Sequence, residues 1–324
     1  MYNQAELKDL VEKAILNLSY NTEAERLIDP VRYILSIGGK RIRPVLALMA
    51  CNLFNDKIDD AIMPAAGIEI FHNFTLVHDD IMDQAPVRRN FQTVHTRWNI
   101  NQAVLSGDVM AFVANDCFLH SPQHCMAKVF RVFNKTAVEV CVGQQLDMDY
   151  ERAAIVSHEE YIRMIELKTS VLLAASVKIG GIIGGADDKD SDLLYEFGRN
   201  LGLAFQIQDD LLDIYGDSKV FGKTKCGDII ADKKTFPYVK AMEIGTGKQV
   251  KQLQELYSGK ESDQETKIKK VIDLYDQLNI REITETLAYD YINKAFGYLQ
   301  KVSVDESKKK EMINLAISLI GRDK

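Results

Sequence analysis

Two short segments of the sequence each carry three aspartates among apolar residues. Both follow the pattern Asp-Asp-x-x-Asp, once from Asp79 to Asp83 and again from Asp209 to Asp213. In a helix the outer aspartates of this pattern lie on one face, one turn apart, where like charges repel. A hard divalent cation would relieve that repulsion. Mg²⁺ fits best, because it takes one or two carboxylates together with substrate phosphates and water.

A single segment of this kind has a plainer interpretation, since an isolated copy is usually a solvated helix face or a helix cap. Two copies, each inside an apolar run, favour metal binding, because buried carboxylates are costly unless they are paired. The middle aspartates of the two copies are Asp80 and Asp210.

Basic residues occur where they could bind phosphate oxygens, bidentately for arginine and as a point charge for lysine. Lys40 and Arg43 share a face if their segment is helical, and a surface basic patch is the alternative. For Lys168 the alternative is a helix lysine whose stem packs on apolar surface. Acidic clusters combined with such cations favour a diphosphate substrate. The cations are Lys40, Arg43, Arg88, Arg89, Lys168, Lys223 and Lys233.

Other patterns that could carry chemistry fail. Gly222-Lys223-Thr224 lacks the correctly spaced upstream glycine of a P-loop. Glu69 and His72 match one half of a ferritin-like di-iron site, but the sequence contains no second half.

The composition of the sequence indicates which binding partners and which cellular compartment to expect. The 324 residues carry a net charge of −7, which argues against nucleic acid as the main partner, because that partner needs a basic surface. The five cysteines form no C-x-x-C pair and suggest buried thiols in a reducing cytoplasm. No signal peptide and no run near the roughly 20 apolar residues of a membrane span is evident, so we expect a cytoplasmic protein without stable membrane insertion.

Helical periodicity dominates the chain. Apolar residues from Leu7 to Leu18 recur at steps of three and four and form one stripe. Ser or Thr followed by Glu three residues on predicts helix starts at Thr22, Ser157 and Ser303. We see no convincing strand alternation and no repeat at a solenoid period. The sequence therefore predicts one all-α domain over residues 1–324.

With these residues in view, the sequence resembles the trans-isoprenyl diphosphate synthases, the polyprenyl synthetase family, and is closest in pattern to geranylgeranyl and farnesyl diphosphate synthases. The resemblance covers most of the chain, and two intact aspartate segments in this order are specific to it. The matching segments are Gly38–Pro44, Asp79–Asp83, Arg88-Arg89, Gln92–Trp98, Ser106–Asp108, Gly143–Asp149, Lys168-Thr169, Gln206–Asp213, Gly222-Lys223, Gly227-Asp228 and Lys233–Thr235.

The resemblance implies a large helical bundle around a central cavity, a homodimer, and three Mg²⁺ ions per active site, with Mn²⁺ as an alternative. It implies that Asp79, Asp83 and Asp209 bind the metal, supported by Asp80, Asp210 and Asp213. The implied catalytic residues are Asp79, Asp80, Asp83, Lys168, Asp209, Asp210 and Lys223. The implied allylic diphosphate ligands are Arg88, Lys168, Thr169, Gln206, Lys223 and Lys233. The implied isopentenyl diphosphate ligands are Lys40, Arg43, His72 and Arg89.

The implied reaction is the head-to-tail condensation of isopentenyl diphosphate with an allylic diphosphate, which gives an all-trans prenyl diphosphate. The allylic carbon–oxygen bond breaks to leave a carbocation and diphosphate, and preplaced cations favour that transition state. The departing diphosphate is implied to remove the final proton. A non-catalytic regulatory subunit of another synthase, and a head-to-head synthase or cyclase, are the alternatives.

Product length is expected to depend on Phe71, Phe74 and Thr75, which precede the first aspartate segment and would form the floor for the growing chain. Phe74 and Thr75 lie five and four residues before Asp79, and only Phe74 is aromatic. This pattern resembles geranylgeranyl-type enzymes. We therefore expect a C20 product, with C15 or a longer chain as alternatives. Plain core packing is the alternative role for the two phenylalanines.

Three positions depart from the pattern of the family. Asn90 and Cys226 stand where glycine is usual, and Asp232 stands where asparagine is common and adds negative charge beside Lys233. These departures concern loops and leave the aspartate segments intact.

Overall fold

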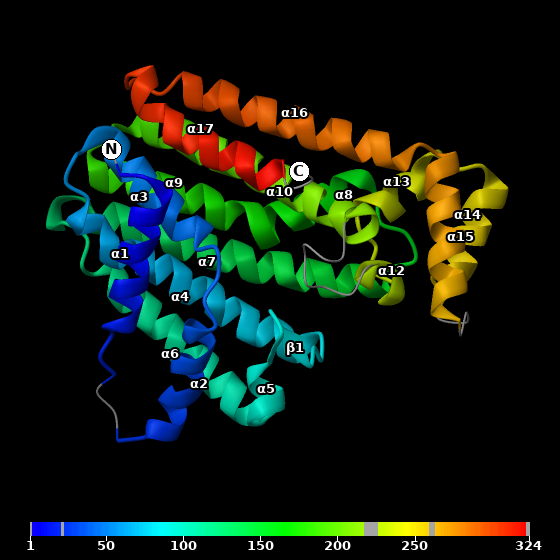
Figure 1. Cartoon of the computed structure of the whole chain (residues 1–324), viewed down its shortest axis with the longest axis horizontal. Helices are drawn as coiled ribbons and strands as arrows, with labels where there is room; N and C mark the ends of the chain where they lie inside the picture. Colours follow the sequence, from blue (N-terminus) through cyan, green and yellow to red (C-terminus); the bar gives the residue numbers. More distant parts are fainter. Residues whose placement is uncertain (1, 21–22, 217–225, 259–262, 322–324) are drawn as a thin grey trace. The chain divides into compact units, whose positions relative to one another are not determined.

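The computed structural model describes residues 2–20, 23–216, 226–258 and 263–321. Almost all regular structure within these ranges is helical (Figure 1). The predicted all-α class is confirmed.

The helices follow one another along the chain with short connections. The N-terminal ones are α1 (Gln4–Leu16), α2 (Glu25–Ser36), α3 (Ile42–Phe54), α4 (Asp59–Met82), α5 (Val94–Arg97) and α6 (Ile100–Phe118). The central ones are α7 (Gln123–Arg152), α8 (His158–Ile165), the π-helical turn η1 (Glu166–Ser170), α9 (Val171–Gly184) and α10 (Asp188–Tyr215). The C-terminal ones are α12 (Gly227–Ile230), α13 (Phe236–Ile244), α14 (Gly247–Leu256), α15 (Gln264–Gln277), α16 (Ile280–Gln300) and α17 (Glu306–Ile320).

The described residues also include one small hairpin, which the sequence analysis did not predict. Strands β1 (Val87–Arg88) and β2 (Phe91–Gln92) pair in antiparallel fashion.

The chain divides into two compact units. The first unit contains Met1–Lys135, Leu172–Tyr195 and Leu299–Leu315, and the second contains Thr136–Val171, Glu196–Tyr298 and Ala316–Lys324. The single domain predicted for residues 1–324 stays a prediction.

In the first unit, α4 and α6 lie side by side (Figure 1). The predicted apolar stripe buries Leu7, Val11 and Ile15 of α1. Helix α9 also approaches α3 closely, because a Cβ on Gly180 would lie 1.9 Å from the Ala47 carbonyl oxygen. Only glycine permits that backbone contact.

In the second unit, the core gathers buried side chains from α8, α10, α13 and α15, including Tyr161, Ile207, Phe236 and Tyr275. Helices α14 and α15 lie side by side (Figure 1).

Of the predicted helix starts, Ser157 is confirmed, since it forms a capping box with Glu160. Ser303 is wrong as a cap: its backbone N–H and hydroxyl instead donate to Asp190. Thr22 lies outside the described residues.

The continuous helical stretch His158–Gly184 is long and apolar enough to match a membrane span by length and composition, which corrects the expectation that no segment comes near one. Of its most apolar window, 78% is buried within the protein. Burial of this kind is typical of a core helix.

Candidate active site

The first aspartate segment lies at the C-terminal end of α4. Asp79 and Asp80 occupy its last turn, and Asp83 is its C-cap residue. The carbonyl end of a helix carries partial negative charge, so carboxylates there need a counter-cation. Arg88 of β1 supplies one. Its Nε lies 2.8 Å from Asp80 Oδ1, and its Nη2 lies 3.4 Å from Asp79 Oδ2.

Asp80 is the buried member of this segment, and only 1% of its surface is exposed. Burial raises the pKa of Asp80, and the hydrogen bond from Arg88 acts in the opposite direction. Its second oxygen, Oδ2, has no hydrogen-bond partner among the described residues. A buried carboxylate oxygen without a donor is a position that a cation would satisfy.

The donor set fits magnesium, because Asp79, Asp80 and Asp83 offer hard oxygen atoms. Within the described ranges, no group of three or more His, Cys, Asp or Glu side chains is arranged to hold a metal by itself. Mg²⁺ does not need such a cage, since it usually keeps waters and binds substrate phosphates.

The hairpin after α4 turns on two residues, Arg89 and Asn90, whose φ angles are +51° and +66°. Positive φ at both central residues is the requirement of a type I′ turn. Asparagine tolerates this conformation better than other non-glycine residues, which explains how Asn90 replaces the usual glycine. The turn directs Arg88 to the aspartates and Arg89 to a second cluster.

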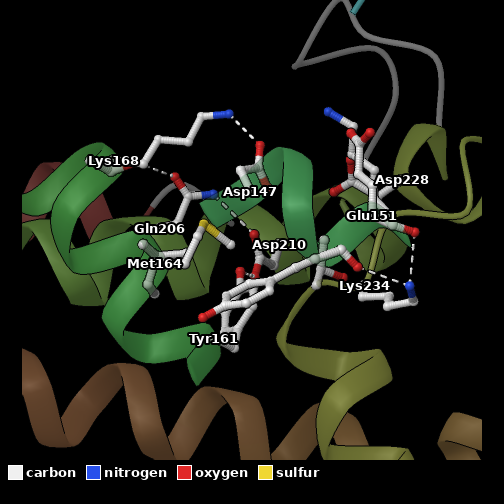
Figure 2. A pocket seen from close by; sticks show the side chains of 14 residues that line it. Asp147, Glu151, Tyr161, Met164, Lys168, Gln206, Asp210, Asp228 and Lys234 are labelled. Carbon is white, nitrogen blue, oxygen red and sulfur yellow. Dashed lines mark hydrogen bonds and ion pairs between the residues drawn. The ribbon is translucent and has the colours of Figure 1, made fainter. Parts of the chain in front are cut away.

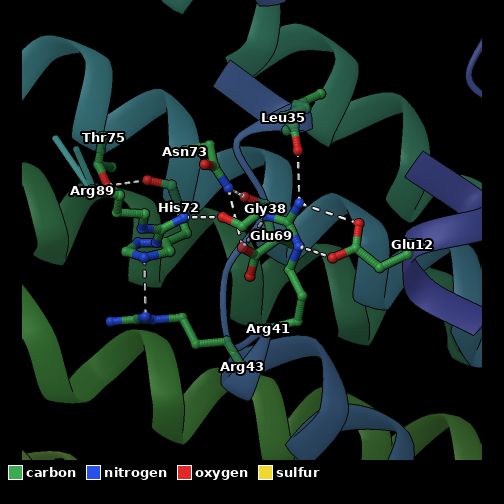
Figure 3. Close-up of polar contacts among 10 residues, drawn as sticks. All are labelled: Glu12, Leu35, Gly38, Arg41, Arg43, Glu69, His72, Asn73, Thr75 and Arg89. Atoms are coloured by element: carbon green, nitrogen blue, oxygen red, sulfur yellow. Dashed lines mark hydrogen bonds and ion pairs between the residues drawn. The ribbon is translucent and has the colours of Figure 1, made fainter. Parts of the chain in front are cut away.

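That second cluster gathers cationic and imidazole groups from three segments (Figure 3). Arg43 Nη1 lies 3.1 Å from His72 Nε2, and Arg89 donates to the Gly38 carbonyl oxygen. Burial, reinforced by Arg43, lowers the pKa of His72 well below its usual range, so the ring is neutral and accepts from Arg43. Burial also lowers the pKa of Arg43 to about 10. Arg43 Nε has no hydrogen-bond partner among the described residues. The two guanidinium groups are donors for an anion, so we call Arg43, His72 and Arg89 the anion cluster.

Lys40 is exposed and precedes α3, whose N-cap residue Arg41 is in the left-handed conformation with φ +50°. The premise that Lys40 and Arg43 share a helical face is therefore wrong, because the helix begins only at Ile42.

Arg41 donates instead to groups of α1, α2 and α4 (Figure 3). Its Nη1 lies 2.8 Å from Glu69 Oε1, its Nε lies 2.9 Å from Glu12 Oε1, and its Nη2 donates to the Leu35 carbonyl oxygen at 2.7 Å. Glu69 is thus committed to a buried ion pair, which agrees with the rejection of a di-iron half-site.

The proposed chain-length residues lie about one to two turns before Asp79. Phe71 is buried, with its ring 5.1 Å from that of Phe133 and 5.4 Å from that of Phe74. Phe74 is half-buried, and the Thr75 hydroxyl donates to the His72 carbonyl oxygen. Phe71 thus has a packing role, and Phe74 is the more accessible of the two aromatic residues.

The second aspartate segment lies near the end of α10, in the second unit. Asp210 is buried and fully engaged by protein donors (Figure 2). Its Oδ2 accepts from the Tyr161 hydroxyl and from the Phe236 backbone N–H at 3.2 Å, and its Oδ1 accepts from Gln206 Nε2 at 3.0 Å. Burial, with Asp228 as the next cause, raises the pKa of Asp210 to about 8. Asp210 therefore anchors the segment.

The flanking aspartates are more accessible than Asp210. Asp209 and Asp213 are both half-buried. Asp213 Oδ2 accepts from the Asp228 backbone N–H at 3.1 Å, which ties α10 to α12.

Lys168 lies in the π-helical turn η1, and such turns occur frequently at functional sites. Its Nζ forms an ion pair with Asp147 of α7. Helix α7 approaches this turn so closely that a Cβ on Gly143 would lie 2.2 Å from the Lys168 backbone nitrogen. Thr169 Oγ1 donates to Gln206 Oε1 at 3.1 Å, which links the turn to Asp210 through one glutamine.

Lys168, Thr169, Gln206 and Asp210 line a cleft of about 130 Å³ in the second unit (Figure 2). Its wall includes Lys233, and Lys234 caps the end of α7 by donating to the carbonyl oxygens of Tyr150, Glu151 and Ala153. The lining residues are Asp147, Tyr150, Glu151, Tyr161, Met164, Ile165, Lys168, Thr169, Gln206, Asp210, Asp228, Lys233, Lys234 and Thr235.

The other two departures from the family pattern are also accommodated. Cys226 and Asp232 have φ angles of +59° and +57°, the region in which glycine and asparagine are favoured. Cys226 is buried, and its backbone N–H donates to the Asp213 carbonyl oxygen at 2.8 Å. Asp232 forms an ion pair with Lys267.

The structure thus gathers the predicted residues into two sets. In the first unit Arg88 contacts Asp79 and Asp80, and Arg43, His72 and Arg89 form the anion cluster. In the second unit Lys168, Thr169, Gln206, Asp210 and Lys233 line one cleft. Lys223 lies outside the described residues.

Sequence reasoning missed Asp147 as the partner of Lys168, Tyr161 as a partner of Asp210, and Lys267 as the partner of Asp232. A signal existed for Asp147, because the segment Gly143–Asp149 matches the family pattern, although no role was assigned to it. Tyr161 and Lys267 have no such signal, since their partners are 49 and 35 residues away along the chain.

Comparison with known proteins identifies the family. The family model described as polyprenyl synthetase matches residues 24–275. A geranylgeranyl diphosphate synthase from Methanosarcina mazei is 34% identical over 97% of this chain and 95% of its own length. A crystal structure of a geranylgeranyl pyrophosphate synthase is 38% identical, with a TM-score of 0.94 and complete coverage of both chains.

A polyprenyl synthase from Caulobacter crescentus, solved as a complex with calcium and isoprenyl diphosphate, is 26% identical with a TM-score of 0.85, and the match covers 99% of this chain and 94% of the other. The family match spans most of the chain, and the relatives match nearly end to end. This chain belongs to the polyprenyl synthetase family.

Proposed function

We propose that this prenyltransferase condenses isopentenyl diphosphate with an allylic diphosphate, head to tail, to give an all-trans prenyl diphosphate. The observation that carries the proposal is the two-residue turn after α4. It brings Arg88 to the aspartate segment and Arg89 to the cluster of Arg43 and His72. The first unit therefore contains an acidic site suited to a metal ion and a cationic site suited to an anion. The consecutive residues Arg88 and Arg89 contact one site each.

Magnesium, held by Asp79, Asp83 and Asp209, would supply positive charge to the leaving diphosphate as the allylic carbon–oxygen bond breaks. Support for a divalent metal comes from the carboxylate donor set and from the calcium present in the Caulobacter crescentus relative. Three Mg²⁺ ions per active site, with Mn²⁺ as an alternative, are part of the proposal.

The side chains of the chain itself bind and orient the two substrates. Lys168 and Lys233 lie in the cleft of the second unit, where they would neutralise the allylic diphosphate. Gln206 and Thr169 hold Lys168's turn against Asp210. The anion cluster of the first unit would bind the diphosphate of isopentenyl diphosphate, whose double bond would attack the allylic C1 atom.

No protein base is assigned to the last step. His72 is neutral but is already hydrogen-bonded to Arg43, so its role is to orient that guanidinium. We propose that the departing diphosphate removes the final proton.

We further propose that the main product is C20, with C15 and longer chains as alternatives. The named relatives support this length, since the one from Methanosarcina mazei is a geranylgeranyl diphosphate synthase. A homodimer in the cytoplasm, without stable membrane insertion, completes the proposal. Exposed apolar side chains support self-association, for example Phe112 on α6, of which 74% is exposed, and Val138 on α7.

The decisive experiment incubates the purified protein with Mg²⁺, labelled isopentenyl diphosphate and, in turn, dimethylallyl, geranyl and farnesyl diphosphate. Chromatography of the dephosphorylated products gives the chain length. Chelation of the metal with EDTA should abolish product formation, and added Mg²⁺ should restore it.

Variants test the assignment of the aspartates. Asp79→Ala and Asp209→Ala should each lower kcat at least about 100-fold. Each variant removes a carboxylate proposed to bind the metal that stabilises the transition state. Asp188→Ala is the matched control, since Asp188 is an exposed aspartate at the start of α10 whose side chain pairs with Lys128 on the surface. Undiminished turnover in Asp79→Ala would contradict the proposed site.

A further inference from the structure

The turn that follows α12 carries an acidic residue directly beside a cleft lysine. Asp232 adopts φ +57°, and Lys233 after it lines the cleft of the second unit. The Lys233 backbone N–H donates to the Asp228 carbonyl oxygen at 2.9 Å, which fixes the main chain at that point. A carboxylate next to a lysine that binds phosphate would repel the substrate unless its charge is compensated.

Lys267 of α15 provides the compensation from 35 residues further along the chain. Its Nζ lies 2.7 Å from Asp232 Oδ1 and 3.5 Å from the Ile230 carbonyl oxygen. Its ammonium group also lies 5.3 Å from the centre of the Tyr257 ring. The side chain of Lys267 is 6% exposed, whereas that of Asp232 is 34% exposed. Lysine is rarely buried to this extent without a partner.

The arrangement is more than a surface ion pair, because one partner is buried and has three contacts. Such a pair is poor evidence of stability, since desolvation offsets much of the attraction. Its clearer effect is electrostatic: the pair is neutral, so Asp232 adds no net negative charge beside Lys233.

We propose that Lys267 is a positioning residue for the allylic diphosphate, because it neutralises Asp232 so that this carboxylate does not oppose Lys233 at the cleft. The inference deepens the proposed function and depends on it, because it concerns the diphosphate that the cleft would bind. It assigns a role in substrate binding to α15, a helix with no residue among the predicted ligands.

The test is a charge cycle on the pair, with the KM of each substrate measured separately. Lys267→Met leaves a lone carboxylate and should raise the KM for the allylic diphosphate about tenfold, while kcat and the KM for isopentenyl diphosphate change by less than about twofold. Asp232→Asn removes the negative charge and should not raise the allylic KM. Asp232→Asn/Lys267→Met should return the KM to near the wild-type value, and Lys267→Arg should retain it.

Lys269→Met is the matched control, since Lys269 is an exposed lysine on the same helix. Thermal melting checks that each variant is folded. If Lys267→Met does not fold, the allylic KM of three other variants is compared with that of the wild type to test the proposal. These are Asp232→Asn, Lys267→Arg and the double variant. A higher allylic KM in Asp232→Asn or in the double variant would overturn the proposal, because a purely structural role predicts loss in both.

Binding of inorganic diphosphate in the presence of Mg²⁺, measured by calorimetry, separates this inference from the proposed function. If the wild type forms no prenyl product yet binds diphosphate, and Lys267→Met weakens that binding about tenfold, only the reaction is wrong. If the wild type is active and Lys267→Met matches Lys269→Met in the allylic KM and in diphosphate binding, the role of Lys267 is refuted.

Discussion

Gly143 of α7 offers the sharpest test of how the second unit positions Lys168. A Cβ at this position would lie 2.2 Å from the Lys168 backbone nitrogen, 2.6 Å from the Leu167 carbonyl carbon and 2.7 Å from Lys168 Cα. All three are backbone atoms, so no side chain can rotate out of the way. Gly143→Ala must therefore separate α7 from the π-helical turn.

The magnitude follows from the size of the clash. Non-bonded carbon atoms prefer separations of about 3.5–4.0 Å, so the two backbones must part by about 1 Å or more. Overpacking of this kind costs about 1–3 kcal/mol, of which the better helix propensity of alanine recovers about 1 kcal/mol. A displacement of about 1 Å at a positioning group reduces turnover by about 100-fold. Gly143→Ala should thus lose far more activity than stability.

The assay compares kcat and the thermal midpoint of Gly143→Ala with those of Gly297→Ala. A Cβ on Gly297 of α16 would meet no neighbouring atom within 4 Å, so alanine there should stabilise the helix by about 1 kcal/mol and leave kcat unchanged. Wild-type turnover in a folded Gly143→Ala would refute the claim that the close approach of α7 positions Lys168.

Three further predictions concern the first unit. Because burial, and then Arg43, holds the pKa of His72 well below its usual range, the unfolded chain takes up a proton below about pH 6.5 that the folded chain refuses, so stability should fall by up to about 1.4 kcal/mol per pH unit below that point. Urea titrations at two pH values should show this slope in the wild type and not in His72→Gln; equal slopes would contradict it. Phe74→Ala should lengthen the products on chromatography more than Phe71→Ala, since Phe74 is the more accessible ring, and unchanged lengths in both variants would refute the floor. Asn90→Val should raise the KM for isopentenyl diphosphate, because a β-branched residue resists the left-handed turn, whereas Asn90→Gly should not; similar KM values in the two variants would exclude the turn as the cause.

The fold class and the placement of the two acidic segments in helices could be predicted from sequence, because both depend on local spacing. The apolar stripe of α1 and the aspartates of α4 repeat at helical intervals that are visible without coordinates. The hairpin could not be predicted, since its turn consists of Arg89 and Asn90 rather than a typical hairpin pair, and its conformation depends on what the two arginines contact.

Within the aspartate segments, sequence could not separate the members by role. Asp80 and Asp210 look identical in pattern, yet one leaves an oxygen without a described donor and the other accepts three hydrogen bonds. Two of the three partners of Asp210, Tyr161 and Phe236, come from α8 and α13, so only tertiary packing determines them. The same holds for Lys267, whose role depends on a turn far away in sequence.

Arg88 and Arg89 are successive residues of one hairpin, and a planar peptide bond connects their Cα atoms at a fixed spacing. The acidic end of α4 and the anion cluster are therefore mechanically coupled. Any change in the backbone of this hairpin would move the bases of both side chains together, so the two positions share one support.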